Sequence, residues 1–146
     1  MIIISIKVPK FVNQSYLTIN INNMQFNNLE LSAVLKVGFC MANADGKLEQ
    51  DEMKVLAVGM AEFGVDEQHF QLLSTLADAM SPATMLATLT ALNESQKKFV
   101  CGFLATIMIS DGDIDDSEVK LWQLTSSLCG FPTMSIAEAA DYWRTH

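Results

Sequence analysis

The feature that most constrains the fold of this chain is an internal repeat, which relates residues that lie 66 positions apart. Ala44–Glu52 matches Ser110–Glu118 in an Asp-Gly pair, an aliphatic residue, an acid and a final Glu, and Gly64 further on matches Gly130. Similarity at a constant spacing is typical of a duplicated structural unit. We therefore predict that each half contains a helix, an acidic loop, a second helix and a glycine stop. Two such units in one domain would pack around an approximate two-fold axis.

Outside the loops, the apolar residues follow the period of a helix. From residue 29 onward they recur every three to four positions, which indicates amphipathic helices. The predicted helices cover residues 31–42, 53–63, 67–80, 82–92, 94–110, 116–129 and 136–143. The connections between them are short, and no second domain boundary is visible. The predicted fold class is all-α, a compact bundle of about seven helices with an internal pseudo-two-fold repeat.

Residues with capping chemistry mark where several of these helices begin and end. Ser, Asp and Asn accept hydrogen bonds from the first N–H groups of a helix, and a Glu or Gln three residues later can bond back. Glycine after the last turn suits a left-handed C-cap. The predicted N-caps are Asp66, Ser81 before Pro82, Asn93 with Gln96 and Ser135 with Glu138, and the predicted stops are Gly64 and Gly130.

Residues 1–28 differ in composition from the rest of the chain, with six Asn, six Ile and no acidic residue. Residues 2–8 and 15–22 alternate between apolar and other side chains, which favours a β-hairpin connected around Pro9–Gln14. The alternative is a non-native extension, because AT-rich upstream DNA encodes such a composition and Met24 is a plausible true start. We describe the chain as an atypical N-terminal extension, residues 1–28, and a single helical domain, residues 29–146.

The formal net charge of −8 restricts the kinds of partner that this protein can bind. An acidic surface repels nucleic acid and anionic membranes, so cations, basic proteins or basic peptides are the expected partners. The longest apolar stretch is Phe99–Ile109, which is shorter than the roughly 20 residues that a membrane-spanning helix needs. This stretch is instead predicted to be a helix that is buried on all sides.

The cysteine and histidine residues do not form a recognisable site. Cys40, Cys101 and Cys129 lie in apolar stretches without a Cys-x-x-Cys spacing, so we expect buried free thiols in a reducing compartment. The chain has two histidines, His69 and His146, which are too few for a Cys/His zinc site. No nucleophile elbow, P-loop or His-Glu-x-x-His motif is present, and we expect no enzymatic activity.

The two acidic loops have the spacing of the second half of a calcium-binding EF-hand loop. In that loop an Asp precedes the turn glycine, an aliphatic residue anchors the loop, and a Glu at the start of the next helix gives two oxygens. The candidate metal ligands are Asp45, Glu49, Glu52, Asp111, Asp115 and Glu118.

The first half of each loop departs from the EF-hand pattern. Met41 and Ile107 occupy the positions where the first Asp belongs, and Asn43 and Ile109 occupy the third position. Calcium takes six to eight oxygen ligands, so each loop would bind it weakly, with a dissociation constant on the order of 10⁻⁴–10⁻³ M.

A second interpretation assigns the same acidic residues to helix capping alone. Glu49 and Asp115 would cap the following helices, while Glu52 and Glu118 would bond back to the cap amides. In that case the loops bind no metal, and the acidic surface would serve as an adaptor that recruits a basic or apolar protein partner.

The repeated loops also resemble a known family. Ser110–Glu118, followed by Ser127–Pro132, resembles the second half of the tellurite-resistance TerB-like family, which includes the TerB and DjlA N-terminal-like helical domains, and Ala44–Glu52 resembles its first half. The resemblance covers roughly residues 30–143. It implies an all-helical, pseudo-symmetric domain of the bacterial cytoplasm that binds divalent cations in both loops. It also implies a non-enzymatic role in stress-response or metal-related complexes, some of which associate with the inner face of the membrane.

Overall fold

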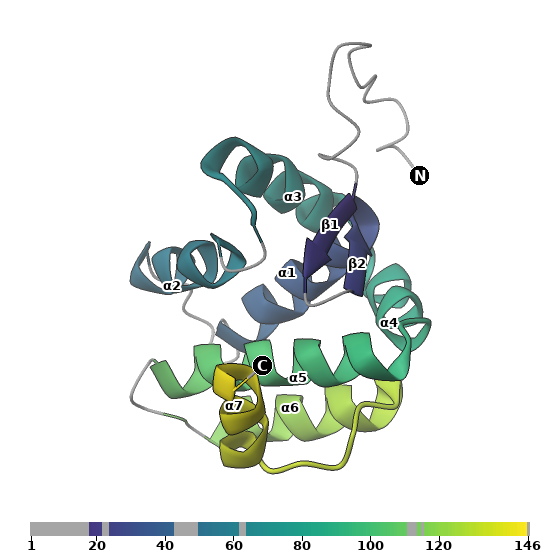
Figure 1. The fold of residues 1–146 in the computed structure, drawn as a ribbon, viewed down its shortest axis with the longest axis vertical. Coiled ribbons are helices and arrows are strands. Elements are labelled where there is room, and N and C mark those ends of the chain that lie inside the picture. Colours follow the sequence, from purple (N-terminus) through teal and green to yellow (C-terminus); the bar gives the residue numbers. More distant parts are fainter. Residues whose placement is uncertain are drawn as a thin grey trace.

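A computed structural model of the chain describes residues 18–21, 24–42, 50–61, 64–110, 114 and 116–145. This part of the chain forms a helical bundle preceded by one short hairpin, which leads directly into the first helix (Figure 1). The all-α prediction is confirmed. The strands are β1 (Thr18–Ile21) and β2 (Met24–Asn27), and the helices are α1 (Asn28–Ala42), α2 (Gln50–Ala61), α3 (Glu67–Ala79), α4 (Pro82–Thr90), α5 (Glu94–Ser110), α6 (Asp116–Cys129) and α7 (Ile136–Thr145).

The helices begin where the predicted capping residues place them. Asp66 accepts a hydrogen bond from the backbone N–H of His69 at 2.8 Å, and Ser81 Oγ accepts one from Thr84 at 3.1 Å. The Asn93–Gln96 and Ser135–Glu138 pairs each form the reciprocal bonds of a capping box. A further capping box, which we did not predict, joins Asn27 and Glu30 at the start of α1.

The internal repeat is visible in the element boundaries. α1 and α5 begin at Asn28 and Glu94, and α2 and α6 begin at Gln50 and Asp116, so both pairs keep the spacing of 66 residues. The last residues of α3 and α7, Ala79 and Thr145, are also 66 residues apart. α1 packs against α3 as α5 packs against α7, and the cross-contacts between halves are reciprocal, because α1 contacts α6 and α2 contacts α5. This arrangement confirms the pseudo-two-fold repeat.

Both halves also end their second helix with the same backbone motif. Gly64 has φ 82° and Gly130 has φ 70°, a left-handed conformation that glycine adopts without steric cost. The N–H of Val65 donates to the carbonyl of Met60, and its equivalent at Phe131 donates to Ser126. These bonds are the long hydrogen bond of a Schellman motif, so both predicted glycine stops are confirmed.

The core is centred on α5, whose residues Phe99–Ala105 are all buried. α7 crosses this helix at close range (Figure 1), and Gly102 makes the approach possible. A Cβ atom on Gly102 would lie 2.9 Å from the backbone oxygen of Ala139 and 3.0 Å from Cβ of Trp143. The Trp143 ring packs on Phe99, with a centroid distance of 4.5 Å. The prediction that Phe99–Ile109 is buried on all sides is confirmed for residues 99–105 but is wrong at the C-terminal end, where Ile109 is 43% exposed.

The N-terminal hairpin differs from the predicted one. β1 lies within the predicted strand 15–22, but it pairs antiparallel with β2, with Thr18 opposite Asn27 and Ile21 opposite Met24. The predicted partner, residues 2–8, lies outside the described residues. The adjacent pairing needs only a two-residue connection, and it places Phe26 in the core with no exposed surface. The core therefore includes a residue from the segment 1–28.

The environment of one cysteine also differs from the prediction. Cys101 and Cys129 are buried free thiols as expected, but Cys40 is exposed near the end of α1. Its neighbour Met41 faces the core instead. An apolar stretch predicts a buried helix, but the neighbouring elements decide which of its faces remains open.

Candidate functional site

Most of the predicted metal ligands lie where the structure gives no side-chain geometry. Asp45, Glu49, Asp111 and Asp115 are outside the described residues, and Glu52 lies in α2 at a position where only the backbone is described. Among the side chains that the structure does describe, no group of three His, Cys, Asp or Glu residues is placed to hold a metal ion. The cation sites in the two loops therefore stay a prediction.

The described residues on either side of the loops define what kind of site could form there. Met41, at the first ligand position of the EF-hand pattern, is only 2% exposed in the core, and its equivalent Ile107 packs against the same core. An apolar side chain that faces the core gives no oxygen to a metal. The first ligand position of the EF-hand pattern therefore provides no side-chain oxygen in either loop.

Glu118 is the predicted ligand whose side chain is described, and it is only 9% exposed. It is the third residue of α6, at the helix end where unpaired N–H groups and the helix dipole favour a negative charge. Glu52 is the third residue of α2. Each acidic loop is therefore followed by a glutamate in the first turn of the next helix.

The aliphatic anchor of the second loop is not buried as the EF-hand pattern predicts. Ile114 occupies that position and is 38% exposed. An EF-hand loop is anchored through its aliphatic residue to a paired loop, and the equivalent residue of the first loop, Leu48, lies outside the described residues.

One groove lies beside the second helix of each half. The sequence analysis predicted neither of the two grooves. The first, which we call the α6 groove, has a volume of about 500 Å³ between α6 and the segment 131–136. The second, the α2 groove, has about 560 Å³ between α2 and α3. They share six equivalent lining positions, namely Ala57/Gln123, Ala61/Ser127, Val65/Phe131, Asp66/Pro132, Glu67/Thr133 and Phe70/Ile136. The repeat therefore extends to the surface of the protein.

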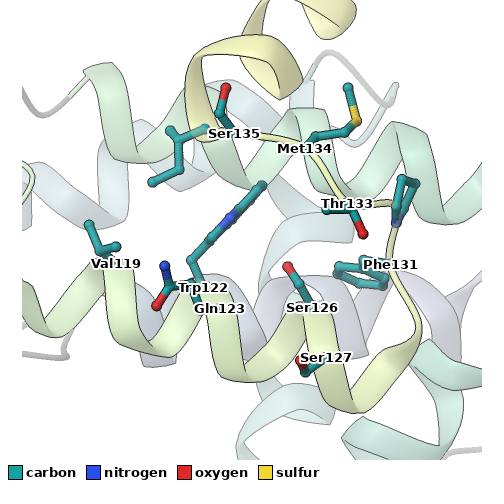
Figure 2. Close-up of a pocket in the computed structure, with 11 residues that line it drawn as sticks. Val119, Trp122, Gln123, Ser126, Ser127, Phe131, Thr133, Met134 and Ser135 are labelled. Carbon is teal, nitrogen blue, oxygen red and sulfur yellow. The ribbon is translucent and has the colours of Figure 1, made fainter.

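The α6 groove combines aromatic walls with hydroxyl groups. Trp122 and Phe131 are 4% and 7% exposed, and the Ser126 hydroxyl lies between them and points into the groove (Figure 2). Ser126 Oγ is buried and has no hydrogen-bond partner in the part of the chain that the structure describes. The lining includes no charged residue. The groove therefore has an uncharged lining of aromatic, aliphatic and hydroxyl-bearing side chains.

The buried thiols are unsuited to nucleophilic chemistry. Burial raises the pKa of Cys101 to about 12. Burial also raises the pKa of Cys129, and this effect is partly offset by a hydrogen bond with Thr90 and by the charge of Lys97. Because the thiolate is the reactive form, burial disfavours reaction at both groups.

Comparison with known proteins identifies a relative among the solved structures. No protein-family model and no curated protein matches the chain. A crystal structure of a protein of unknown function from Porphyromonas gingivalis W83 is 38% identical, with a TM-score of 0.75. The match covers 86% of this chain and 95% of that chain. The chain belongs to the family of this Porphyromonas gingivalis protein. Because the match spans nearly all of that family member, the helical bundle is the family's fold and not a local likeness.

The described helices show no sign of a membrane-spanning segment. None of them is long and apolar enough to cross a bilayer. The apolar face of α5 is covered by α7, α1 and α2.

Proposed function

We propose that this protein is a non-enzymatic module that binds divalent cations through its two acidic loops. The observation that carries the proposal is the equivalent structural setting of the loops. The helices on either side of the first loop begin 66 residues before the equivalent helices of the second loop, and each loop is followed by a glutamate in the third position of the next helix, at Glu52 and Glu118. A duplicated loop that keeps its acids in the same place in both halves supports a role that both halves share.

The charge density of the loops supports the same proposal. Residues 45–52 contain four acids, and residues 111–118 contain five. Helix N-termini stabilise nearby carboxylates by only about 0.3–1 kcal/mol each, which is little against the mutual repulsion of so many charges. A divalent cation would offset much more of it. With no oxygen donor at Met41 or Ile107, calcium would bind with a dissociation constant on the order of 10⁻⁴–10⁻³ M.

A cation titration followed residue by residue by NMR tests the proposal. We expect millimolar calcium to shift amide resonances in residues 45–52 and 111–118, and to raise the melting temperature. The paired substitution Asp111→Asn and Glu118→Gln should abolish the shifts in the second loop only, and its repeat equivalent, Asp45→Asn and Glu52→Gln, those in the first.

A matched control separates metal binding from the effects of charge and capping. Asp78→Asn removes one exposed acid from α3, far along the chain from both loops, and should leave the titration unchanged. The stability of each variant is also measured in a chelator, where loss of a helix cap still appears but loss of a metal ligand does not. No response of the wild-type protein to calcium, magnesium, manganese or zinc would refute the proposal.

The resemblance to the TerB-like family supports a more specific role in a cytoplasmic stress response. In this proposal the protein contributes a cation-responsive domain to a larger complex, which could associate with the membrane only peripherally. Growth of a deletion strain on tellurite and on elevated divalent metals tests this role. Wild-type growth under every such condition would argue against it.

A further inference from the structure

We propose that this protein forms a two-fold dimer in solution, in which α6 packs antiparallel against α6 of a second copy. The contact surface is the row Leu121, Leu124 and Leu128, which we call the outer seam. This inference is independent of cation binding in the loops. It rests on the exposure and spacing of these leucines, on the charges around them and on the difference between the two halves of the repeat.

α6 presents two rows of side chains for packing, whereas a helix at the surface of a bundle needs one. The buried row consists of Glu118, Trp122, Thr125 and Cys129. The outer seam is separate from it, because Leu124 and Leu128 are 55% and 54% exposed and Leu121 is partly buried at the edge of the core. Two leucines this exposed on adjacent turns of one helix indicate an interaction surface.

The spacing of the outer seam fits a second helix. Leu121, Leu124 and Leu128 follow one another at intervals of three and four residues, which is the spacing of a coiled-coil seam. In an antiparallel pair, Leu124 lies opposite the partner's Leu128, and Leu128 lies opposite the partner's Leu124. The seam is therefore complementary to itself, as a two-fold interface requires.

The distribution of charge favours a second copy as the partner. Each chain has a formal net charge of −8, so two copies repel each other, and the repulsion is weakest where their surfaces carry no charge. No charged residue occurs between Leu121 and Ala137, and none occurs in α4, which packs against α6. Two acidic chains can therefore approach each other through this face, whereas a basic partner would gain no electrostatic attraction from it.

Two charged residues at the start of α6 decide the direction of the pair. Lys120 and Asp116 are exposed and precede Leu124 by one and two turns. A parallel pair would place each of them against the same residue of the partner, and like charges in contact are unfavourable. With Leu124 opposite the partner's Leu128, an antiparallel pair separates the two Lys120 residues by about 18 Å along the helix axis. The antiparallel direction therefore avoids the repulsion.

The first half of the repeat lacks an equivalent seam. Val58 on α2 matches Leu124 and is 67% exposed, but Glu62 stands in the sequence at the position of Leu128. The apolar row is thus interrupted by a charge in the first half and continuous in the second. Val58 provides a matched control position, because it is exposed and apolar but has no second apolar residue one turn later.

Sedimentation velocity at protein concentrations from micromolar to millimolar tests the proposal. We expect the mass to rise from the 16.1 kDa of one chain to twice that value, with or without a chelator, because the outer seam lies outside both loops. Leu124→Glu should weaken dimerisation at least tenfold by placing an unpaired charge in the interface, whereas Val58→Glu should not. Circular dichroism checks that both variants are folded. A wild-type protein that stays monomeric, or an equal effect of the two substitutions, would overturn the proposal.

Mixing pairs of variants tests the antiparallel contact. Leu124→Lys and Leu128→Glu should each be monomeric at concentrations where the wild type is a dimer. Their mixture should associate, because the introduced lysine lies opposite the introduced glutamate. A mixture of Leu124→Lys with Leu124→Glu has the same charges but should associate more weakly, since these two positions are not opposite each other. Equal association of the two mixtures, or the reverse order, would overturn the proposed arrangement.

Discussion

Replacing Gly102 by alanine should destabilise the protein, although the same change in a free helix would be favourable. Replacing glycine by alanine inside a helix raises helix stability by about 0.8–1 kcal/mol, because alanine loses less backbone entropy on folding. Against this, the new Cβ would lie 2.9 Å from the Ala139 oxygen and 3.0 Å from Cβ of Trp143. Both are atoms of the α7 backbone or directly attached to it, so the whole helix must shift. Overpacking of this kind typically costs about 1–3 kcal/mol, and we expect a net loss of roughly 1 kcal/mol in the free energy of unfolding.

Gly38→Ala is the matched control for this prediction. Its new Cβ would meet Leu56 Cδ2 at 2.8 Å, which is the mobile end of a side chain that can rotate away. We expect Gly38→Ala to change stability by less than about half of the loss at Gly102, because the entropic gain offsets a small rearrangement. Urea denaturation measures both variants, and the chemical shifts of Ile136 report movement of α7 beside the α6 groove. A Gly102→Ala protein as stable as the wild type would refute the close approach of α7 to α5.

Three further predictions follow from single residues. Gly64→Ala and Gly130→Ala should each cost about 1–2 kcal/mol in urea denaturation, because each puts a Cβ in the left-handed region, and a neutral result at either would contradict its positive φ. Burial lowers the pKa of His69, whose Nε2 lies 2.8 Å from Oδ1 of Asn28, and the nearby Asp66 only partly opposes this. As the pH falls, His69 is protonated at a higher pH in the unfolded chain than in the folded protein. The free energy of unfolding should therefore fall as the pH drops below about 6.5, and this fall should be smaller in the His69→Gln variant. A thiol reagent should modify Cys40 rapidly in the native protein and the two buried thiols only after unfolding, and rapid reaction of all three would contradict their burial.

Local signals in the sequence predicted the helical framework well. Capping residues such as Asp66 and Asn93 satisfy backbone N–H groups a few residues away, so their effect does not depend on the rest of the fold. The glycine stops have the same local character. The second strand of the hairpin was missed, because its pairing depends on Phe26 entering the core, and a core is formed by residues distant in sequence.

The candidate sites were only partly predictable for the same reason. The repeat identified Glu118 as a candidate ligand, but its burial depends on how α6 packs in the bundle. Neither groove was predicted, since each forms between a helix and a segment that approaches it only in the folded chain. The residue types at equivalent lining positions differ, as Ala57 and Ala61 do from Gln123 and Ser127, so the repeat gave no signal for either groove.

The sequence by itself therefore determined the repeat, the helices and their ends, because these follow from periodicity and from hydrogen bonds between near neighbours. The tertiary structure decided which face of each element is covered. It left Cys40 exposed, buried Met41 in the core, and left the Ser126 hydroxyl buried without a hydrogen-bond partner among the described residues. Exposure of a side chain depends on which elements pack over it, and that packing is a property of the whole bundle.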